Sequence, residues 1–158
     1  MKKYIELIEN IFKEMEWKYD YREDNNVFIS GVNSNEMMGN LKMFIFMEEN
    51  SCNVYWVFGH NVEKSYLPTV SEFLHRANFG LKDGNFEMDY DDGEIKYKTF
   101  VNFLNSDVSK EVLQRTMFIG VQMFKQYAKG LLKVMLGDEK VKECIEMCEG
   151  EEEQGISM

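Results

Sequence analysis

The sequence predicts an α+β domain in which helices pack on one mainly antiparallel sheet. Runs of alternating apolar and polar residues come in pairs joined by short polar turns, a pattern typical of β-hairpins. Around these pairs lie segments whose apolar residues recur at helical spacing. We therefore expect the order α-β-β-β-(β)-α-β-β-α, with neighbouring strands antiparallel and the helices covering the sheet.

The N-terminal segment begins with an amphipathic helix. Residues 1–16 place apolar side chains on one helical face, namely Tyr4, Ile5, Ile8, Ile11, Phe12 and Met15. Aromatic and polar residues then alternate over residues 17–22, which predicts a short strand. Asn25 and Asn26 mark a turn, and residues 27–32 form the next predicted strand.

Residues 41–48 and 51–58 predict a hairpin with a two-residue turn at Glu49 and Asn50. The turn fixes a register that pairs Leu41 with Phe58, Met43 with Trp56, Ile45 with Val54 and Met47 with Cys52. This face is wholly apolar and is expected to be core. The opposite face is also half apolar, which is unusual for a sheet surface open to water.

Residues 67–78 predict the second helix. Two different caps are compatible with the sequence at its N-terminus. Either Ser65 caps the helix with Pro68 in the first turn, or Thr69 caps it with Glu72 completing a capping box.

A second hairpin is predicted around Asp92-Gly93, because this dipeptide favours a two-residue turn with positive φ. Residues 85–91 and 94–104 alternate on either side of it. The turn would pair Tyr90 with Ile95, Met88 with Tyr97 and Phe86 with Thr99 on one face, and Asp89 with Lys96 and Glu87 with Lys98 on the other. Apolar pairing and charge pairing agree on this register.

Three stretches of this region resemble one known family. They are FLHRAN at residues 73–78, GNFEMD at residues 84–89 and DGEIKY at residues 92–97. Together they resemble the YbjN family, with its asparagine-bearing helix end, its G-x-F-x-(x)-D strand, its Asp-Gly type of turn and its returning strand. The family is called a bacterial sensory transduction regulator family. The resemblance implies a fold similar to the type III secretion chaperones and supplies no catalytic residues.

Residues 109–135 predict the longest helix. Phe118, Ile119 and Val121 lie off its inner face, and a helix that is apolar beyond one stripe is usually buried on more than one side. A partner subunit is one way to cover them. After this helix, residues 141–148 predict only one or two amphipathic turns.

Length and composition predict one folded domain. With 158 residues and 44% hydrophobic side chains, the chain is long enough to bury a core. Residues 138–158 hold two lysines and eight acidic residues, and so carry −6 of the net charge of −10. We expect a single YbjN-like domain over residues 1–149 and an acidic, disordered tail over residues 150–158.

Charge and hydropathy exclude several classes of function. The acidic chain lacks the basic footprint that nucleic acid needs. It has no apolar run of the roughly 18 residues that a membrane span requires, and its N-terminus lacks the apolar core of a signal peptide. We therefore expect a cytoplasmic protein that binds neither nucleic acid nor membranes. The cysteines are expected to be reduced thiols without a structural disulfide; they are Cys52, Cys144 and Cys148.

No pattern of residues identifies a reaction. His60 and His75 have no Cys, His or carboxylate at metal-ligand spacing. Cys144 and Cys148 stand four residues apart, which without further ligands is a weak zinc pattern. The acidic run around Asp92 departs from the EF-hand order, since its glycine comes one position too early. We therefore expect a non-enzyme with no catalytic, cofactor-binding or metal-binding residues.

Apolar side chains opposite the core predict an interaction surface. The first hairpin supplies Phe44, Phe46 and Tyr55, and the second supplies Phe100. An exposed apolar patch on a sheet usually marks an interface. We expect a homodimeric, chaperone-like adaptor or signalling regulator that binds a protein partner through these four residues.

The alternative is a small-molecule-binding domain or a modest enzyme. A curved sheet capped by helices can enclose a pocket. Aromatic residues are the candidates to line it, namely Tyr19, Tyr21, Tyr55, Trp56 and Tyr97. No convergent set of polar groups accompanies them in the sequence.

Overall fold

The structure, a computed structural model, describes the backbone of residues 1–33 and 37–155 and the side chains of these residues up to Gly150. The elements are α1 (Lys2–Glu14), β1 (Asp20–Arg22), β2 (Val27–Asn33), β3 (Asn40–Met47), β4 (Ser51–Val57), α2 (Leu67–Gly80), β5 (Asn85–Met88), β6 (Ile95–Asn102), α3 (Lys110–Met135) and α4 (Val141–Gly155). The α+β class is confirmed, and four strands precede the second helix.

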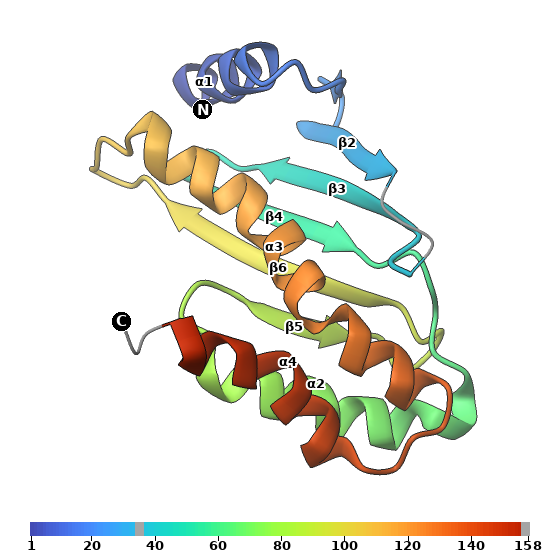
Figure 1. The fold of residues 1–158 in the computed structure, drawn as a ribbon. Coiled ribbons are helices and arrows are strands. Elements are labelled where there is room, and N and C mark those ends of the chain that lie inside the picture. The colour runs from blue at the N-terminus through green and yellow to red at the C-terminus, as the bar shows by residue number, and fades with distance from the viewer. Residues whose placement is uncertain (34–36, 156–158) are drawn as a thin grey trace.

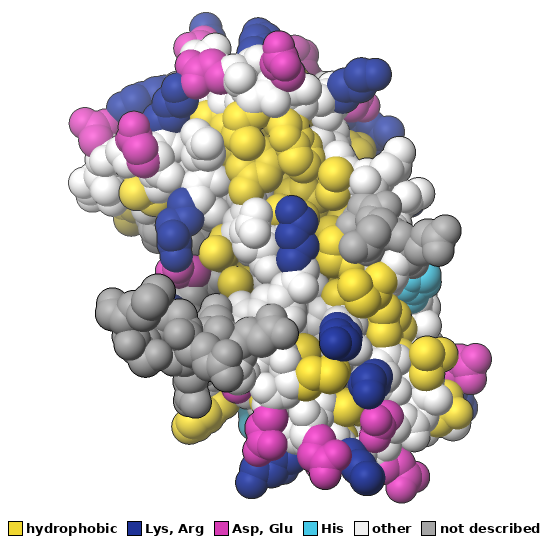
Figure 2. All heavy atoms as spheres, viewed as in Figure 1, with side chains coloured by type: hydrophobic (Ala, Val, Ile, Leu, Met, Phe, Trp, Pro, Cys, Tyr) yellow, Lys and Arg dark blue, Asp and Glu magenta, His cyan; other side chains and the backbone are white. Residues whose placement is uncertain are grey.

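The six strands form one sheet in the order β1-β2-β3-β4-β6-β5, and every neighbouring pair is antiparallel. The helices lie on one side of it, with α3 crossing β4 and β6 (Figure 1). We call this side the covered face and the other side the open face. Apolar side chains gather between α1 and α3 on the covered side, over β2 (Figure 2).

The hairpin of β3 and β4 has the predicted register. Met43 pairs with Trp56 and Ile45 with Val54, and all four side chains are buried on the covered face. The backbone N–H of Glu48 donates to the carbonyl of Ser51 at 2.9 Å, closing the two-residue turn. Strict alternation and a short turn are enough to define this register.

The register predicted for the second hairpin is wrong by two residues. Phe86 pairs with Tyr97 and Met88 with Ile95. The loop is longer than two residues because acidic side chains cap its own backbone: a carboxylate oxygen of Asp89 accepts from the Asp91 N–H at 2.8 Å, and one of Asp92 accepts from the Glu94 N–H at 2.9 Å. An even shift leaves the paired side chains on their predicted faces, while Tyr90, expected opposite Ile95, lies in the turn.

The outer edge of β5 is closed by a side chain of α2. The side-chain oxygen of Asn78 accepts from the backbone N–H of Phe86 at 2.7 Å, and its Nδ2 donates to the Phe86 carbonyl at 2.9 Å. One amide thus supplies the two hydrogen bonds that a neighbouring strand would make. This bond pair fixes α2 against the sheet at the asparagine that the family resemblance singled out.

Neither predicted cap is formed at the N-terminus of α2. A 3₁₀ turn, Lys64–Tyr66, leads directly into the helix, and Tyr66 occupies the capping position without a side-chain hydrogen bond. Pro68 does lie in the first turn, where a missing N–H costs no helical hydrogen bond. The 3₁₀ turn therefore takes the place of a side-chain cap.

The apolar surplus of α3 is partly absorbed inside the chain. Phe118 packs against Trp17 with ring centroids 5.0 Å apart, and Trp17 meets Trp56 edge-on at 6.0 Å. The indole Nε1 of Trp56 donates to the carbonyl of Met117 at 2.7 Å. Phe118 thus seals the junction between α3, the link after α1, and β4.

The C-terminal segment forms a helix longer than the one or two turns expected. Val141, Cys144, Ile145 and Cys148 are buried, and Gly130 of α3 packs against Cys144 and Cys148. Because α4 runs to Gly155, its backbone extends into the expected tail. Residues 156–158 of that tail lie outside the described residues.

Candidate functional site

Alternation along β3, β4 and β6 places the four predicted interaction residues on the open face. We call them, as a group, the sheet-face patch: Phe44, Phe46, Tyr55 and Phe100. Phe44 pairs directly with Tyr55 across the two strands. The rings of Phe44 and Phe46 lie 6.4 Å apart, and Phe46 meets Tyr55 edge-on at 5.8 Å.

Phe100 lies apart from the other three rings. Phe46 pairs with Asn53 on β4, and Asn53 pairs with Phe100 on β6, so a polar residue separates the two phenylalanines. Phe46 is 42% exposed and Phe100 is 54% exposed, while Phe44 and Tyr55 are half-buried. The structure therefore brings three of the predicted residues together and sets the fourth at the edge of the same face.

Charged residues border the sheet-face patch. The ammonium of Lys96 lies 4.6 Å from the ring centre of Tyr55, and that of Lys98 lies 5.9 Å from it. Both ammonium groups are 3.9 Å from Glu87 on β5. The lysines therefore cover the edge of an aromatic surface while a carboxylate partly neutralises them.

A shallow hollow of about 520 Å³ lies over the patch. Phe44, Phe46 and Tyr55 line it, and Phe100 does not; the other lining residues are Glu48, Asn53, Val57, Glu94 and Lys96. Ile29 of β2 also belongs to this face, since it pairs with Phe44. Val57 could be read from the alternation of β4, but Ile29 requires the pairing of β2 with β3, for which the sequence carries no register signal.

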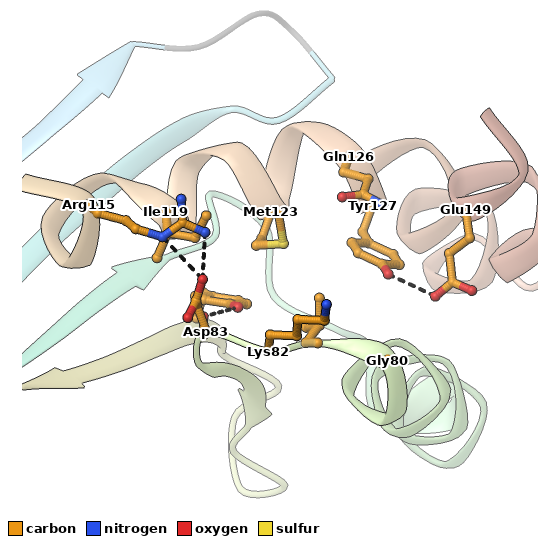
Figure 3. A pocket seen from close by; sticks show the side chains of 11 residues that line it. Gly80, Lys82, Asp83, Arg115, Ile119, Met123, Gln126, Tyr127 and Glu149 are labelled. Atoms are coloured by element: carbon orange, nitrogen blue, oxygen red, sulfur yellow. Dashed lines mark hydrogen bonds and ion pairs between the residues drawn. The ribbon is translucent and has the colours of Figure 1, made fainter. Parts of the chain in front are cut away.

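A second concavity, of about 470 Å³, lies on the covered side between the link after α2, α3 and α4 (Figure 3). Arg115 reaches a carboxylate oxygen of Asp83 at 2.6 Å, and the hydroxyl of Tyr127 donates to Glu149 at 2.8 Å. The hydroxyl of Tyr97 donates to the Asp83 carbonyl at 2.6 Å, while burial and the charge of Asp83 raise the pKa of Tyr97 to about 12. Within this concavity Arg115 is thus held by Asp83 and Glu149 by the Tyr127 hydroxyl.

The five aromatic residues proposed to line a pocket do not line one cavity, although Trp56 and Tyr97 are cross-strand partners. Tyr97 lines the concavity of Figure 3, but Tyr55 lies on the open face. Trp56 is core, and Tyr19 and Tyr21 pack on Phe28 with ring centroids 5.9 and 4.4 Å away. The alternation of these aromatic residues with polar ones correctly predicted extended backbone. Alternation along a strand does not, however, determine which side chains line the same cavity.

Of the other candidate groups, only Cys144 and Cys148 are neighbours, both packed against Gly130. His60 packs edge-on against Phe58 at 5.5 Å, and His75 lies on α2 facing α4. The three cysteines are free and buried, and burial raises the pKa of the Cys52 thiol to about 12. Within residues 1–33 and 37–150, no three His, Cys, Asp or Glu side chains gather as metal ligands do. None of the described helices has the length and apolar character to cross a membrane.

A family model matches residues 4–133, from α1 into the last turns of α3. The family is described as "YbjN: Putative bacterial sensory transduction regulator". The chain belongs to the YbjN family. The match includes all three stretches on which the resemblance was based, and Asn78, the last residue of the first stretch, has a defined structural role in this YbjN-family protein.

Two solved structures are similar to this YbjN-family protein. One is the crystal structure of YbjN from E. coli, described as a putative transcription regulator, at 11% identity and a TM-score of 0.48, covering 82% of this chain and 86% of that chain. The other is the Yersinia pestis type III secretion chaperone SycH in complex with a stable fragment of YscM2, at 13% identity and a TM-score of 0.46, covering 82% and 97%. No curated protein sequence matches this chain.

Proposed function

We propose that this YbjN-family protein is a non-enzymatic interaction module that binds a protein partner through the sheet-face patch. The observation that carries the proposal is a sheet face left open by the helices, with Phe44, Phe46 and Tyr55 in mutual contact on it. Aromatic residues with a charged border are typical of interface centres. The family description supports a regulatory or adaptor role.

The energetics favour a protein over a small ligand at this surface. Full burial of one phenylalanine side chain contributes roughly 1.5–3 kcal/mol. The hollow over the patch is shallow, so a small molecule would leave much of Phe46 in water, whereas a protein surface would cover Phe46 and Tyr55 together. Lys96 and Lys98 on one side, and Glu48 and Glu94 in the lining, favour a partner with charges of both signs around an apolar centre.

The test is an affinity capture from native lysate with the parent protein and the Phe44→Ser/Phe46→Ser variant, read by mass spectrometry. We expect a protein captured by the parent to fall by at least about tenfold with the variant. A matched control is Phe79→Ser/Leu136→Ser, which removes side chains that are 94% and 82% exposed away from the patch. Circular dichroism checks that each variant is folded. Equal capture by all three proteins contradicts the proposal.

The proposal includes a homodimer. Its support is the outer surface of α3, where Phe118 and Ile119 stay half-buried beside the exposed Met15. Sedimentation equilibrium should give twice the chain mass of 18.7 kDa. A monomer at every concentration, with partner capture intact, would remove the dimer and leave the interaction role. We also place the protein in the cytoplasm, because its three thiols are free.

Small-molecule binding is the second candidate, and the concavity of Figure 3 is the observation that favours it. It presents Arg115, Lys82 and Glu149 to one space. A ligand retained in native mass spectra of the parent, and absent from an Arg115→Met variant, would support this function. Native mass spectra that show only the mass of the chain without a ligand, together with a partner captured through the sheet-face patch, would reject the small-molecule-binding function.

A further inference from the structure

The edge of β6 is left open over half of its length. The ladder between β5 and β6 begins where Asn85 pairs with Lys98, so Phe100 and Asn102 have no strand beside them on that side (Figure 1). The chain leaves the sheet at Gly84, whose φ is +94° and which packs within contact of the Lys98 carbonyl. Asp83 then lies on the covered side, above Tyr97.

The backbone hydrogen bonds of β6 alternate between its two sides, and this alternation shows where the unpaired N–H and C=O groups point. The N–H of Phe58 donates to the carbonyl of Ile95, and the N–H of Phe103 donates to that of Asn50, so odd-numbered residues of β6 bond to the β4 side. Even-numbered residues bond to the β5 side, as Glu94 does when it accepts from Asp89. Phe100 and Asn102 therefore direct two N–H and two C=O groups outward. No hydrogen bond to these groups exists on that side within the described residues.

The open edge borders a hollow of about 430 Å³. Its walls come from Gly84, from Thr99 and Phe100 of β6, and from Val112, Arg115 and Thr116 in the first turns of α3. The side chain of Thr99 donates to the Thr116 carbonyl at 2.7 Å, so α3 is fixed above the strand. Phe100 is 54% exposed on one side of the edge and Val112 is 48% exposed on the other.

We infer that this edge binds an extended segment of a partner protein, which adds to the sheet as a strand beside residues 99–102 of β6. Free backbone donors and acceptors in alternation are matched by another strand, and neither a helix nor an apolar surface supplies that pattern. The inference rests on the proposed interaction role and adds the chemistry of the partner to it.

Side chains around the edge define that chemistry further. A residue opposite Phe100 would share the open face, so an aromatic or β-branched residue fits there. Its neighbours would point to the covered side, toward Val112, Arg115 and Lys82. Lys82 and Arg115 are positively charged and Asp83 is negatively charged, so these three side chains carry one net positive charge. This charge favours an acidic residue of the partner segment at one of these positions.

The sheet ends at β1 on one side and at β5 on the other, and the β5 edge beside the open part of β6 is closed. The outward groups of Phe86 on β5 are taken by Asn78, so a strand cannot add there without displacing α2. A second copy fits poorly at β6, because its own edge is recessed between α3 and the link at Gly84. A single extended segment from a different protein is therefore the occupant that the edge accepts.

The test is selection of a displayed library of random twelve-residue peptides on the full chain. We expect enriched peptides with alternating apolar and acidic residues. On binding, the amide protons of Phe100 and Asn102 should exchange more slowly in hydrogen-exchange measurements. Enrichment of no peptide overturns the inference, and peptide-induced dimers in sedimentation would replace it with pairing between copies.

Variants separate backbone pairing from side-chain contact. Phe100→Pro removes the outward N–H and keeps the ladder to β4, whereas Phe100→Ala removes only the ring. We expect the proline variant to bind at least about tenfold more weakly than the alanine variant, the equivalent of one lost hydrogen bond. Val112→Trp, which fills the hollow from α3, should weaken binding similarly even if Phe100→Pro fails to fold.

The sheet-face patch provides the last comparison. Phe44→Ser/Phe46→Ser lies two strands from the open edge and should leave peptide affinity within about threefold. Peptides lost with that variant but kept by Phe100→Pro and Val112→Trp would overturn strand addition and still support the patch. No peptide and no captured partner would contradict both proposals.

Discussion

At the scale of single residues, Asn78 has the most sharply defined role. Its amide satisfies both outward backbone groups of the buried Phe86, at 2.7 and 2.9 Å. We predict that Asn78→Ala lowers the free energy of unfolding by about 1–3 kcal/mol, because an N–H and a C=O lose their partners in a half-buried place. Urea unfolding followed by circular dichroism measures the change.

Asn85 is the matched control for this prediction. Its Nδ2 also donates to the Phe86 carbonyl, but at 3.3 Å and from a half-buried position at the start of β5. Asn85→Ala should cost less than about 0.5 kcal/mol, as substitutions of weakly engaged surface groups do. An equal loss of unfolding free energy in the two variants would show that the two Asn78 hydrogen bonds contribute no more to stability than the Asn85 hydrogen bond.

At the scale of elements, the two hairpins show what a sequence pattern can and cannot define. Glu49 and Asn50 form the short turn that alternation predicts, and the register follows. Around Gly93 the same rule fails by two residues, because Asp89 and Asp92 cap the loop backbone and stabilise a longer connection. Turn length there depends on side-chain hydrogen bonds that periodicity does not report.

For the candidate site, the sequence predicts the sheet face on which each residue lies, but not how the residues of different hairpins are placed relative to one another. Alternation within each hairpin placed Phe44, Phe46, Tyr55 and Phe100 on the open face. Their spacing depends on β6 lying beside β4, a pairing between distant segments that no local pattern defines. For the same reason the open edge of β6 could not be predicted, since it results from where β5 begins.

The packing of α3 on β4 gives a second prediction. A Cβ added at Gly120 would lie 2.4 Å from Cδ1 of Trp56, which is held in place by its bond to Met117. Gly120→Ala should therefore lower the free energy of unfolding by about 1–3 kcal/mol, although alanine favours helices. Chemical unfolding compares it with Gly80→Ala, where a Cβ meets nothing within 4 Å and stability should hold or rise. Stabilisation by both substitutions would contradict this packing.

The end of α1 gives a third prediction, in which a substitution to glycine raises the stability of the protein. Glu16 has φ +56°, and the N–H groups of Glu16 and Trp17 donate to the carbonyls of Lys13 and Phe12, as in a Schellman motif. Glycine adopts this conformation without strain, so Glu16→Gly should raise the free energy of unfolding by about 1 kcal/mol. Glu6→Gly, inside the helix, should lower it by about the same amount. Thermal unfolding tests both, and a loss of stability in each variant would refute the assignment.

At the scale of the whole molecule, stability should fall in alkaline solution. Burial raises the pKa of Cys52 to about 12, and burial with the Asp83 charge raises that of Tyr97 to about 12. Unfolded, these groups ionise near about 8.5 and 10, so above those values the unfolded state binds fewer protons than the folded state. Their contribution is full below about pH 8.5 and is lost progressively up to about pH 12.

Urea unfolding at about pH 8 and about pH 10.5 measures this loss. Tyr97→Phe keeps the ring and removes the ionising hydroxyl, together with its bond to the Asp83 carbonyl. The variant should be less stable at the lower pH but should lose less stability between the two conditions. An unchanged difference would mean that Tyr97 is not held protonated by the fold.

The contact between Trp17 and Trp56 determines which part of the molecule its intrinsic tryptophan fluorescence reports on. The chain has two tryptophans, and they meet 6.0 Å apart at the seam between the link after α1 and β4. Intrinsic fluorescence therefore senses one place. Unfolding of α1 would shift the emission and lower the helical signal in circular dichroism, whereas unfolding of α4 would lower the helical signal and leave the emission unchanged. Recording both signals during unfolding would tell which end of the molecule opens first.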